Sequence, residues 1–334
     1  MSWTKFSNGL CERETGGLHA PRPHLLIIAG PTAVGKSAAA VALAKRLGGE
    51  VISADSMQVY RGMDIGSAKV TQEEMEGVPH HLIDVMDPHE DYNVVRFQQM
   101  AKAAAADILS RGKLPILCGG TGFYIQAFLY DIDFTKEPER ETRELVLLEQ
   151  NLWKQAETEA GREALHRTLT EKDPEAAQAI PCANVKRVIR ALVFCALHGK
   201  PISAHNREQE ARKALACPYD ARFFVLTDAR PALYQRINER VDRMMEAGLL
   251  EEVRSLRDSG VSRSSTAMQG IGYKELCAYL AGESSLEETV DRIKQHSRQY
   301  AKRQLTWFRR ERQVIWIDRS KTEDCVNEII QHLW

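Results

Sequence analysis

The sequence predicts an α/β fold, a P-loop NTPase-like parallel sheet core that carries a mostly helical insertion domain. Three observations predict it. A phosphate-binding loop stands between a predicted strand and a predicted helix. Strand-like and helix-like segments alternate up to about residue 130, and a charged helical stretch then interrupts this alternation. With 334 residues, 43% of them apolar, the chain can bury a large core.

Residues 30–37 fit the G-x-x-x-x-G-K-[ST] pattern of the phosphate-binding loop. The apolar run 25–29 before the loop predicts a buried strand, and the Ala-rich run 38–47 after it predicts a helix. Backbone N–H groups of such a loop bind phosphate oxygens, Lys36 is expected to reach the outer phosphates, and the Ser37 hydroxyl is expected to hold Mg²⁺. The loop residues are Gly30, Pro31, Thr32, Ala33, Val34, Gly35, Lys36 and Ser37.

Further strands and helices follow in alternation. Strands are predicted at 50–53, 81–85 and 114–118, and a helix is predicted at 92–111. Because ligands bind at the carboxyl ends of parallel strands, the residues after these ends are expected to converge on one crevice. These residues are Gly30, Asp55, Asp84 and Thr121.

After residue 131 the composition becomes charged and helical, and a strand pattern returns only at 223–226. We therefore expect a flexible tail at 1–23, a core domain at 24–130 plus 206–334, and a helical insertion at 131–205. The rest of the core is predicted to hold a long helix after Pro231 to about Asp258, helices over 285–310, and a last strand at 314–317.

The overall composition excludes several protein classes. The net charge is −1, so any nucleic-acid footprint must be local. The seven cysteines are scattered singly, which argues against a disulfide framework or a zinc ribbon and fits the cytoplasm. No apolar run is long enough to span a membrane, and the first 23 residues lack a signal-peptide pattern.

Two short segments after predicted strands allow more than one interpretation. Asp55 and Ser56 follow the second strand, where Asp55 could accept a proton or help hold Mg²⁺, and could equally cap a helix. The glycine-rich segment 119–122 could let backbone approach a ligand, with Thr121 offering a hydroxyl. A tight turn between strand and helix also explains the glycines, and for this segment taken alone it is the favoured interpretation.

Basic residues recur at three places. Arg236 and Arg240 share one helix face and suit a pyrophosphate, although a solvated face is the commoner outcome. Lys186, Arg187 and Arg190 cluster in the insertion, and segment 292–312 holds eight Lys or Arg against one acidic residue. The positive charges of these two clusters favour the binding of nucleic acid. The interleaved Trp307 and Phe308 are expected in the core rather than stacked on bases. His80 and His81 are adjacent on a strand and point to opposite faces, so no zinc site is expected.

The chain resembles the tRNA dimethylallyltransferases, enzymes that prenylate an adenosine beside the anticodon. Matching segments run in family order over residues 24–318, and the most specific are 55–66 and 79–88. The others are 30–37, 119–124, 270–274 and 303–308. The chain ends soon after its last predicted strand, without the zinc-finger extension of eukaryotic members, so a bacterial-type enzyme is expected.

The resemblance implies a reaction and roles for named residues. Dimethylallyl diphosphate would bind the P-loop in place of ATP, with Thr32, Lys36 and Arg236 on the diphosphate and Mg²⁺ on Ser37. The adenine N6 would attack the allylic carbon, Asp55 would accept its proton, and Thr121 would touch the substrate near the adenine.

The resemblance also implies tRNA as partner, with the target base flipped into a channel and the insertion gripping the anticodon stem-loop. The implied tRNA contacts are Asp55, Ser56, Met57, Gln58, Lys186, Arg187, Val188, Ile189, Arg190, Gln269, Gly270, Ile271, Gly272, Tyr273 and Lys274. We expect a monomer. Three alternatives remain open: an ATP-dependent small-molecule kinase, an enzyme that prenylates free adenine nucleotides, and a non-catalytic P-loop RNA-binding module.

Overall fold

The chain forms two compact units, which are described separately. The computed structural model describes residues 22–132, 134, 143–213, 217–311 and 313–333. Unit 1 comprises residues 1–129 and 218–334, and unit 2 comprises residues 130–217. Most of the tail predicted at 1–23, with Cys11, lies outside the described residues, as do residues 133 and 135–142 of the predicted insertion. No helix among the described residues is both long and apolar enough for a bilayer.

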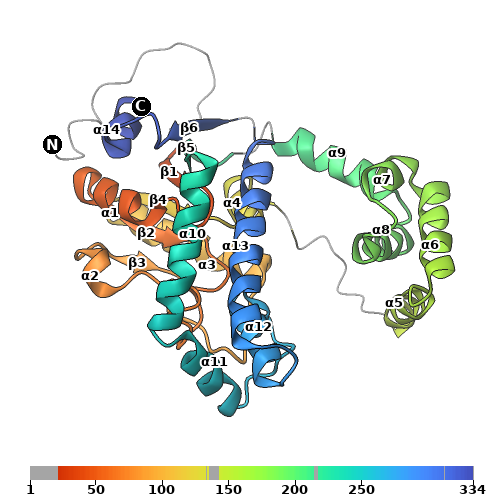
Figure 1. The fold of residues 1–334 in the computed structure, drawn as a ribbon. Coiled ribbons are helices and arrows are strands. Elements are labelled where there is room, and N and C mark those ends of the chain that lie inside the picture. The colour runs from red at the N-terminus through yellow and green to blue at the C-terminus, as the bar shows by residue number, and fades with distance from the viewer. Residues whose placement is uncertain (1–21, 133, 135–142, 214–216, 312, 334) are drawn as a thin grey trace, which may run out of the picture. The chain divides into compact units, whose positions relative to one another are not determined.

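Unit 1 is built on a parallel sheet whose strand order is β3-β2-β4-β1-β5-β6 (Figure 1). Every described strand pairing is parallel, which confirms the predicted α/β core. The central strands are continuous apolar runs because both faces of the sheet are covered. The strands are β1 (His24–Ala29), β2 (Gly49–Ser53), β3 (His80–His81), β4 (Leu114–Gly119), β5 (Asp220–Thr227) and β6 (Val314–Asp318).

Helices cover both faces of this sheet. From β1 the chain crosses β4 to reach β2 through α1 (Lys36–Leu47), and from β3 it returns across β2 to β4 through α3 (Val94–Ser110). Right-handed crossovers in opposite directions place these two helices on opposite faces. On the α1 face, α14 (Cys325–Gln331) packs beside α1, and on the α3 face α4 (Gly122–Leu129) packs beside α3.

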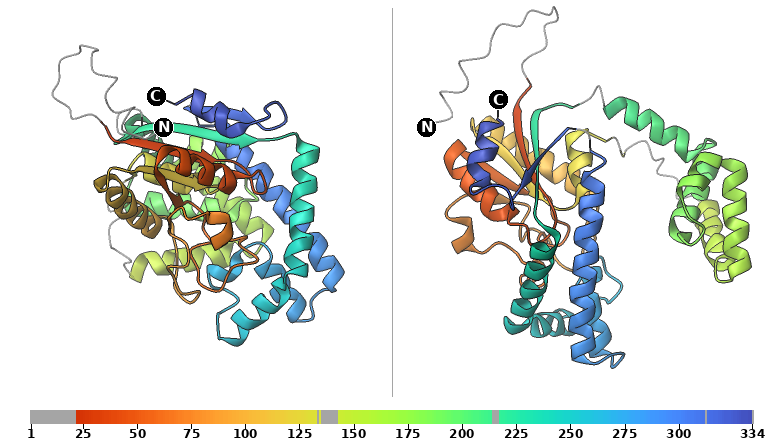
Figure 2. Two further views of the ribbon diagram at one scale, coloured as in Figure 1. Left: turned by 90° about the vertical axis from the view of Figure 1, so that its left-hand side faces the viewer. Right: turned by 45° about the horizontal axis from the view of Figure 1, so that its top comes forward.

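Helices α10 to α13 extend beyond one end of the sheet, whereas α2 packs beside α1. Helices α10 and α13 lie side by side there (Figures 1 and 2). Helices α11 and α12 pack at their far end. The bounds are α2 (Gln72–Met75), α10 (Arg230–Glu246), α11 (Leu249–Asp258), the 3₁₀ turn η2 (Ala267–Gln269), α12 (Tyr273–Leu280) and α13 (Leu286–Phe308).

Two predicted elements are wrong in extent, each for a local backbone reason. The strand expected at 81–85 stops at His81 because Leu82 and Asp84 adopt left-handed conformations, with φ of 64° and 56°. The helix expected from Pro231 to Asp258 is two helices, because Gly248 takes φ of 97° and ends the first.

Unit 2 is helical and has its own apolar core. Its elements are α5 (Arg143–Gln155), α6 (Glu159–Lys172), α7 (Pro174–Ala179), α8 (Val185–His198) and α9 (Ile202–Lys213). Leu165, Leu169 and Leu192 are among its buried core residues. The boundary expected at residue 205 falls inside α9, which packs on α7 and α8. Asp173 ties α9 to α7, since one carboxylate oxygen accepts from the Ser203 N–H at 2.9 Å and the other from the Ala176 N–H.

A buried carboxylate near the start of β2 joins three basic side chains. Glu50 is 1% exposed, and its carboxylate accepts hydrogen bonds from Arg111, Lys113 and His81. These donors, Arg111 first among them, hold the pKa of Glu50 well below its ordinary range. The ionised form is therefore stabilised in the folded protein relative to the unfolded chain.

The pH dependence of folding follows with a definite sign. The stabilisation by Glu50 is fully present above the unfolded pKa of about 4.3 and is lost as the pH falls below it. We expect Glu50→Gln to lower the free energy of unfolding at pH 7 by about 1–3 kcal/mol. The deficit should shrink toward pH 3, which urea unfolding at several pH values measures. Glu76→Gln, at an exposed carboxylate paired with Lys45, should follow the wild type throughout. A deficit that is constant with pH would contradict this assignment.

Candidate active site

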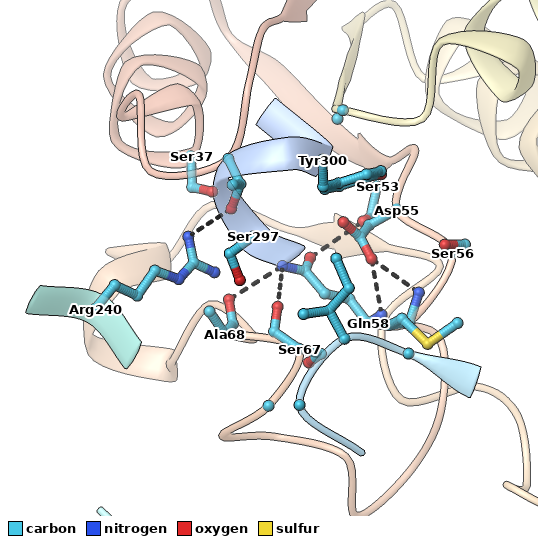
Figure 3. A pocket seen from close by; sticks show the side chains of 18 of the residues that line it. Ser37, Ser53, Asp55, Ser56, Gln58, Ser67, Ala68, Arg240, Ser297 and Tyr300 are labelled. Carbon is cyan, nitrogen blue, oxygen red and sulfur yellow. Dashed lines mark hydrogen bonds between the residues drawn. The ribbon is translucent and has the colours of Figure 1, made fainter. Parts of the chain in front are cut away.

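A cavity of about 390 Å³ opens in unit 1 at the carboxyl ends of the central strands. It is lined by the P-loop after β1, the segment after β2 and the end of β4. Helices α10 and α13 and the segment from η2 into α12 complete the lining. In Figure 3, Asp55 and Tyr300 stand on one side of the pocket and Arg240 and Ser37 on the other. The crevice predicted from strand ends therefore exists.

The P-loop has the backbone shape that its glycines allow. Gly30 and Gly35 have φ of 146° and 91°, and a Cβ on Gly30 would come within 2.5 Å of the Leu226 carbonyl oxygen. Helix α1 begins directly after Gly35, so its positive end faces the loop. The Lys36 ammonium donates to the Pro31 carbonyl at 2.7 Å, and burial lowers the pKa of Lys36 to about 8. The arrangement is that of an anion site.

Arg240 completes this anion site from α10. Its guanidinium lines the cavity and donates to the Thr32 hydroxyl at 3.4 Å. Burial lowers the pKa of Arg240, while the Asp55 carboxylate opposes that effect. Both Thr32 and Ser37 also line the cavity. Four polar groups of unit 1 thus surround one space that suits a diphosphate.

Arg236, which the family resemblance assigned to the diphosphate, is engaged elsewhere. Its guanidinium pairs with Asp228 at 2.6 Å and donates to the Ala33 carbonyl at 3.1 Å. It does not line the cavity. Arg236 and Arg240 do share a face, as their spacing predicted, but only the second reaches the cavity, because it stands one turn further along α10.

Asp55 lies in the cavity with one carboxylate oxygen committed. Its Oδ1 accepts from the backbone N–H groups of Met57 at 2.8 Å and Gln58 at 3.3 Å. These bonds resemble an N-cap, but they close a turn, since the next helix begins only at Gln72. Among the described residues, none donates a hydrogen bond to Oδ2. The second oxygen is therefore available to accept a proton.

The turn after β4 leaves no room for a side chain at its glycines. A Cβ on Gly119 would meet the Ala54 carbonyl oxygen at 2.3 Å, and one on Gly122 would meet Trp307 at 2.2 Å. Gly120 lines the cavity, but Thr121 does not. The Thr121 hydroxyl is buried beside Tyr300, without a well-formed hydrogen bond to any described residue. Burial raises the pKa of Tyr300 to about 12, so its hydroxyl stays protonated.

The opposite wall combines segments 55–58 and 269–274. The cavity is lined there by Ser56, Met57, Gln58, Gln269, Gly270, Ile271, Gly272 and Lys274. Tyr273, expected among the tRNA contacts, is fully buried and donates its hydroxyl hydrogen to Glu252 at 2.7 Å. Its side chain points away from the cavity because α12 begins at this residue and turns it inward.

Glu252 fixes this wall through four hydrogen bonds. Its carboxylate accepts from the N–H groups of Asp64, Ile65 and Gly66, at 2.7–3.0 Å, and from the Tyr273 hydroxyl. A Cβ on Gly66 would approach the Tyr273 ring to 2.5 Å. Glu252 thereby clamps the segment after β2 to α11, and through Tyr273 to α12.

Of the four residues expected at the strand ends, only Asp55 lines the cavity, whereas Gly30, Thr121 and Asp84 do not. Gly30 and Thr121 are next to residues that line it or belong to the same loops, but Asp84 is engaged elsewhere. It is exposed and pairs with Lys69, which also bonds Asp64. His80 and His81 diverge as expected. His80 lines the cavity and bonds the Val78 carbonyl, whereas His81 bonds Glu50.

The two basic clusters differ in their surroundings. On α8 of unit 2, Lys186, Arg187 and Arg190 are exposed, while Val188 and Ile189, also expected to contact tRNA, are 1% exposed core residues. On α13 the charges are partly neutralised from α10, because Lys294 pairs with Asp242 at 2.6 Å. Arg298 donates a hydrogen bond to the side-chain oxygen of Asn238, which is also on α10. Phe308 is fully buried, as expected.

Two residues that shape the site, Glu252 and Gln304, were missed from the sequence. Gln304 lies within the family-matched segment 303–308, which was a usable signal, but no local pattern marked its role.

Comparisons with known proteins agree with this geometry. The family model described as IPP transferase matches residues 58–311, and the one described as isopentenyl transferase matches residues 23–90. A tRNA dimethylallyltransferase of Lachnoclostridium phytofermentans is 53% identical, with 88% of this chain and 91% of that protein covered. One of Bacillus subtilis is 47% identical over 92% of this chain and 96% of its own.

Solved structures show the same resemblance in three dimensions. A full-length tRNA isopentenylpyrophosphate transferase of Bacillus halodurans gives a TM-score of 0.69 at 46% identity, covering 93% of this chain and 95% of its own. A eukaryotic dimethylallyltransferase acting on tRNA gives 0.76 at 30% identity, covering 92% and 77%. The chain therefore belongs to the IPP transferase family, the family of the tRNA dimethylallyltransferases.

Proposed function

We propose that this protein, in the cytoplasm, transfers the dimethylallyl group of dimethylallyl diphosphate to N6 of the adenosine 3′-adjacent to the anticodon in tRNA, releasing diphosphate. The observation that carries the proposal is that one cavity holds both an anion site and a free carboxylate oxygen. Lys36, Arg240 and Asp55 all line this cavity. Figure 3 shows Arg240 and Asp55 on opposite sides of it. Family membership supplies the substrate class.

Different residues act on the leaving diphosphate and on the attacking adenine. The diphosphate binds the P-loop backbone, Lys36 and Arg240, which stabilise the charge that builds on the leaving oxygen as the allylic C–O bond breaks. The adenine N6 forms the new bond to the allylic carbon and loses a proton to Oδ2 of Asp55. Tyr300 carries a hydroxyl in this cavity and can orient the base, and the buried Thr121 hydroxyl beside it can support that role.

The donor set fits a divalent ion, and we propose Mg²⁺. Among the described residues no group of three His, Cys, Asp or Glu side chains could enclose a metal. Ser37 offers a hydroxyl in the same cavity as the phosphate cradle. Mg²⁺ suits such a site, since it prefers oxygen ligands and takes most of them from water and substrate phosphates. When bound, it would offset negative charge on the diphosphate.

We propose that tRNA is recognised by both units. Exposed Lys186, Arg187 and Arg190 on α8 suit the phosphates of an anticodon stem-loop, while Val188 and Ile189 support them from the core of unit 2. In unit 1, the wall formed by 56–58 and 269–274 suits a flipped base. We expect the protein to act as a monomer.

One assay tests the reaction. Purified protein is mixed with Mg²⁺, dimethylallyl diphosphate and unmodified tRNA, and the nucleosides are analysed by mass. A gain of one dimethylallyl group on the adenosine next to the anticodon supports the proposal. Transfer to free adenine nucleotides but not to tRNA would contradict it, as would ATP-dependent phosphorylation of a small acceptor.

The two arginines of α10 are expected to differ. Arg240→Gln should raise the KM for dimethylallyl diphosphate about 10–100-fold, because it removes a charged donor from the cavity. Arg236→Gln should raise it less, since Arg236 bonds Asp228 and reaches the loop only through the Ala33 carbonyl. Steady-state kinetics at saturating tRNA measures both. A larger effect at Arg236 would reverse the assignment.

A further inference from the structure

Gln304 lies between two loops that carry different parts of the reaction. It is 5% exposed, on the face of α13 that also carries Tyr300 one turn earlier, and both line the cavity. Its Oε1 accepts from the Thr32 N–H of the P-loop at 2.9 Å. Its Nε2 donates to the Gly120 carbonyl, in the turn after β4, at 3.0 Å. One amide thus joins two loops.

The Gln304 amide fits tightly and in only one orientation. A Cβ on Gly120 would come within 2.1 Å of Nε2, so residue 120 must be glycine for the side chain to reach its place. The amide cannot be reversed, because its nitrogen would then face the Thr32 N–H and its oxygen the Gly120 carbonyl. Both bonds are formed in a buried place, where an unpaired amide is costly.

The two loops belong to the sites of two different substrates. Thr32 belongs to the anion site, and its hydroxyl accepts from Arg240. Gly120 directly precedes Thr121, whose buried hydroxyl has no well-formed bond within the described part of the chain. Because Gln304 accepts the Thr32 N–H, that donor does not point toward a bound phosphate. The contribution of Gln304 is therefore to geometry rather than to diphosphate affinity.

We propose that Gln304 is a positioning residue that sets the separation between the diphosphate loop and the Thr121 turn, and thereby holds the allylic carbon in line with the attacking N6. The inference rests on the proposed transfer reaction. Such a link acts only when both substrates are present, since each loop can bind its own ligand without it. Its loss should slow the joint step and leave the separate affinities in place.

The test compares Gln304→Met, which keeps the length but removes both hydrogen bonds, with Gln299→Met, the same substitution at an exposed position of the same helix. In Gln304→Met we expect the single-turnover transfer rate at saturating substrates to fall about 100-fold. The Kd for inorganic pyrophosphate should stay within about threefold of the wild type, as expected when ground-state binding is unchanged. Gln299→Met should match the wild type in both.

A second variant separates the two bonds. Gln304→Glu keeps an acceptor for the Thr32 N–H but places an oxygen against the Gly120 carbonyl. If the link between loops matters, its transfer rate should fall as far as that of Gln304→Met. An unchanged rate in either variant would overturn the inference. So would a loss of pyrophosphate affinity that matches the loss of rate, because the residue would then only shape the P-loop.

A readout independent of prenyl transfer keeps this inference distinct from the proposed function. Hydrogen–deuterium exchange should quicken together in the peptides that contain Thr32 and Gly120 in Gln304→Met, and in neither peptide in Gln299→Met. If wild-type protein transfers no prenyl group, the proposed function fails while this exchange result still tests the link. If exchange changes in one peptide only, Gln304 does not couple the loops and the inference fails.

Discussion

Asp55→Asn should reduce the rate of prenyl transfer about 10²–10⁴-fold, the usual contribution of a general base. The asparagine still offers Oδ1 to the N–H groups of Met57 and Gln58, so the turn after β2 keeps its hydrogen bonds. What it loses is the second oxygen, which faces the cavity and can take the N6 proton. Single-turnover transfer, followed by nucleoside mass analysis, measures the effect.

Two comparisons make this result specific to proton transfer. Binding of inorganic pyrophosphate should stay within about threefold of the wild type, since only the transition state needs the base. Asp291→Asn, at an exposed position of α13 away from the cavity, should behave as the wild type. Full activity in Asp55→Asn would show that the proton leaves by another route, and would reopen the view of this residue as a turn-forming group alone.

Glu252→Ala should lower the free energy of unfolding by about 2–4 kcal/mol, because it leaves several donors without their acceptor. The N–H groups of Ile65 and Gly66 and the Tyr273 hydroxyl are partly or fully buried, so water replaces the carboxylate only in part. Transfer should also slow at least about tenfold, since the clamped segment runs on from Asp55 and forms one wall of the cavity. Urea unfolding and single-turnover kinetics measure the two effects.

The neighbouring carboxylate provides the matched control for Glu252. Glu251 is exposed, and its nearest cation, Arg254, lies 3.7 Å away. Glu251→Ala should therefore change the stability by less than about 0.5 kcal/mol. Tyr273→Phe removes one of the four bonds and should cost about 1 kcal/mol. Equal losses in the Glu251 and Glu252 variants would mean that the bonds to segment 64–66 contribute nothing.

The parts of the site that follow local rules were predictable. Residues 30–37 form a phosphate loop because glycine spacing and flanking elements determine it, and Asp55 enters the cavity because it closely follows the carboxyl end of a parallel strand. Asp84 does not, since the left-handed residues after His81 end the strand early. A single residue such as Leu82 with positive φ leaves no signature in apolar periodicity.

The parts that depend on distant partners were not predictable. Gln304 bonds Thr32 across 272 positions, and Glu252 bonds segment 64–66 across about 186. No window of sequence contains both members of either pair. Tyr273 was assigned to the tRNA contacts because the family resemblance implies the whole segment 269–274, but its side chain is buried at the start of α12. The limit of the insertion was missed because α9 lacks a clear apolar face.

The strand order has a consequence for biosynthesis. Strand β1 pairs with β4 on one side and with β5 on the other, but along the chain the residues of unit 2 come between β4 and β5. On the ribosome, one edge of this strand, apolar from Leu25 to Ala29, must therefore wait for its neighbour while the insertion is made, for roughly 5–20 s at ordinary elongation rates. An open apolar edge invites intermolecular pairing. Unit 2 can meanwhile fold on its own core, and nascent chains halted before residue 220 should be the most prone to aggregate and to recruit chaperones.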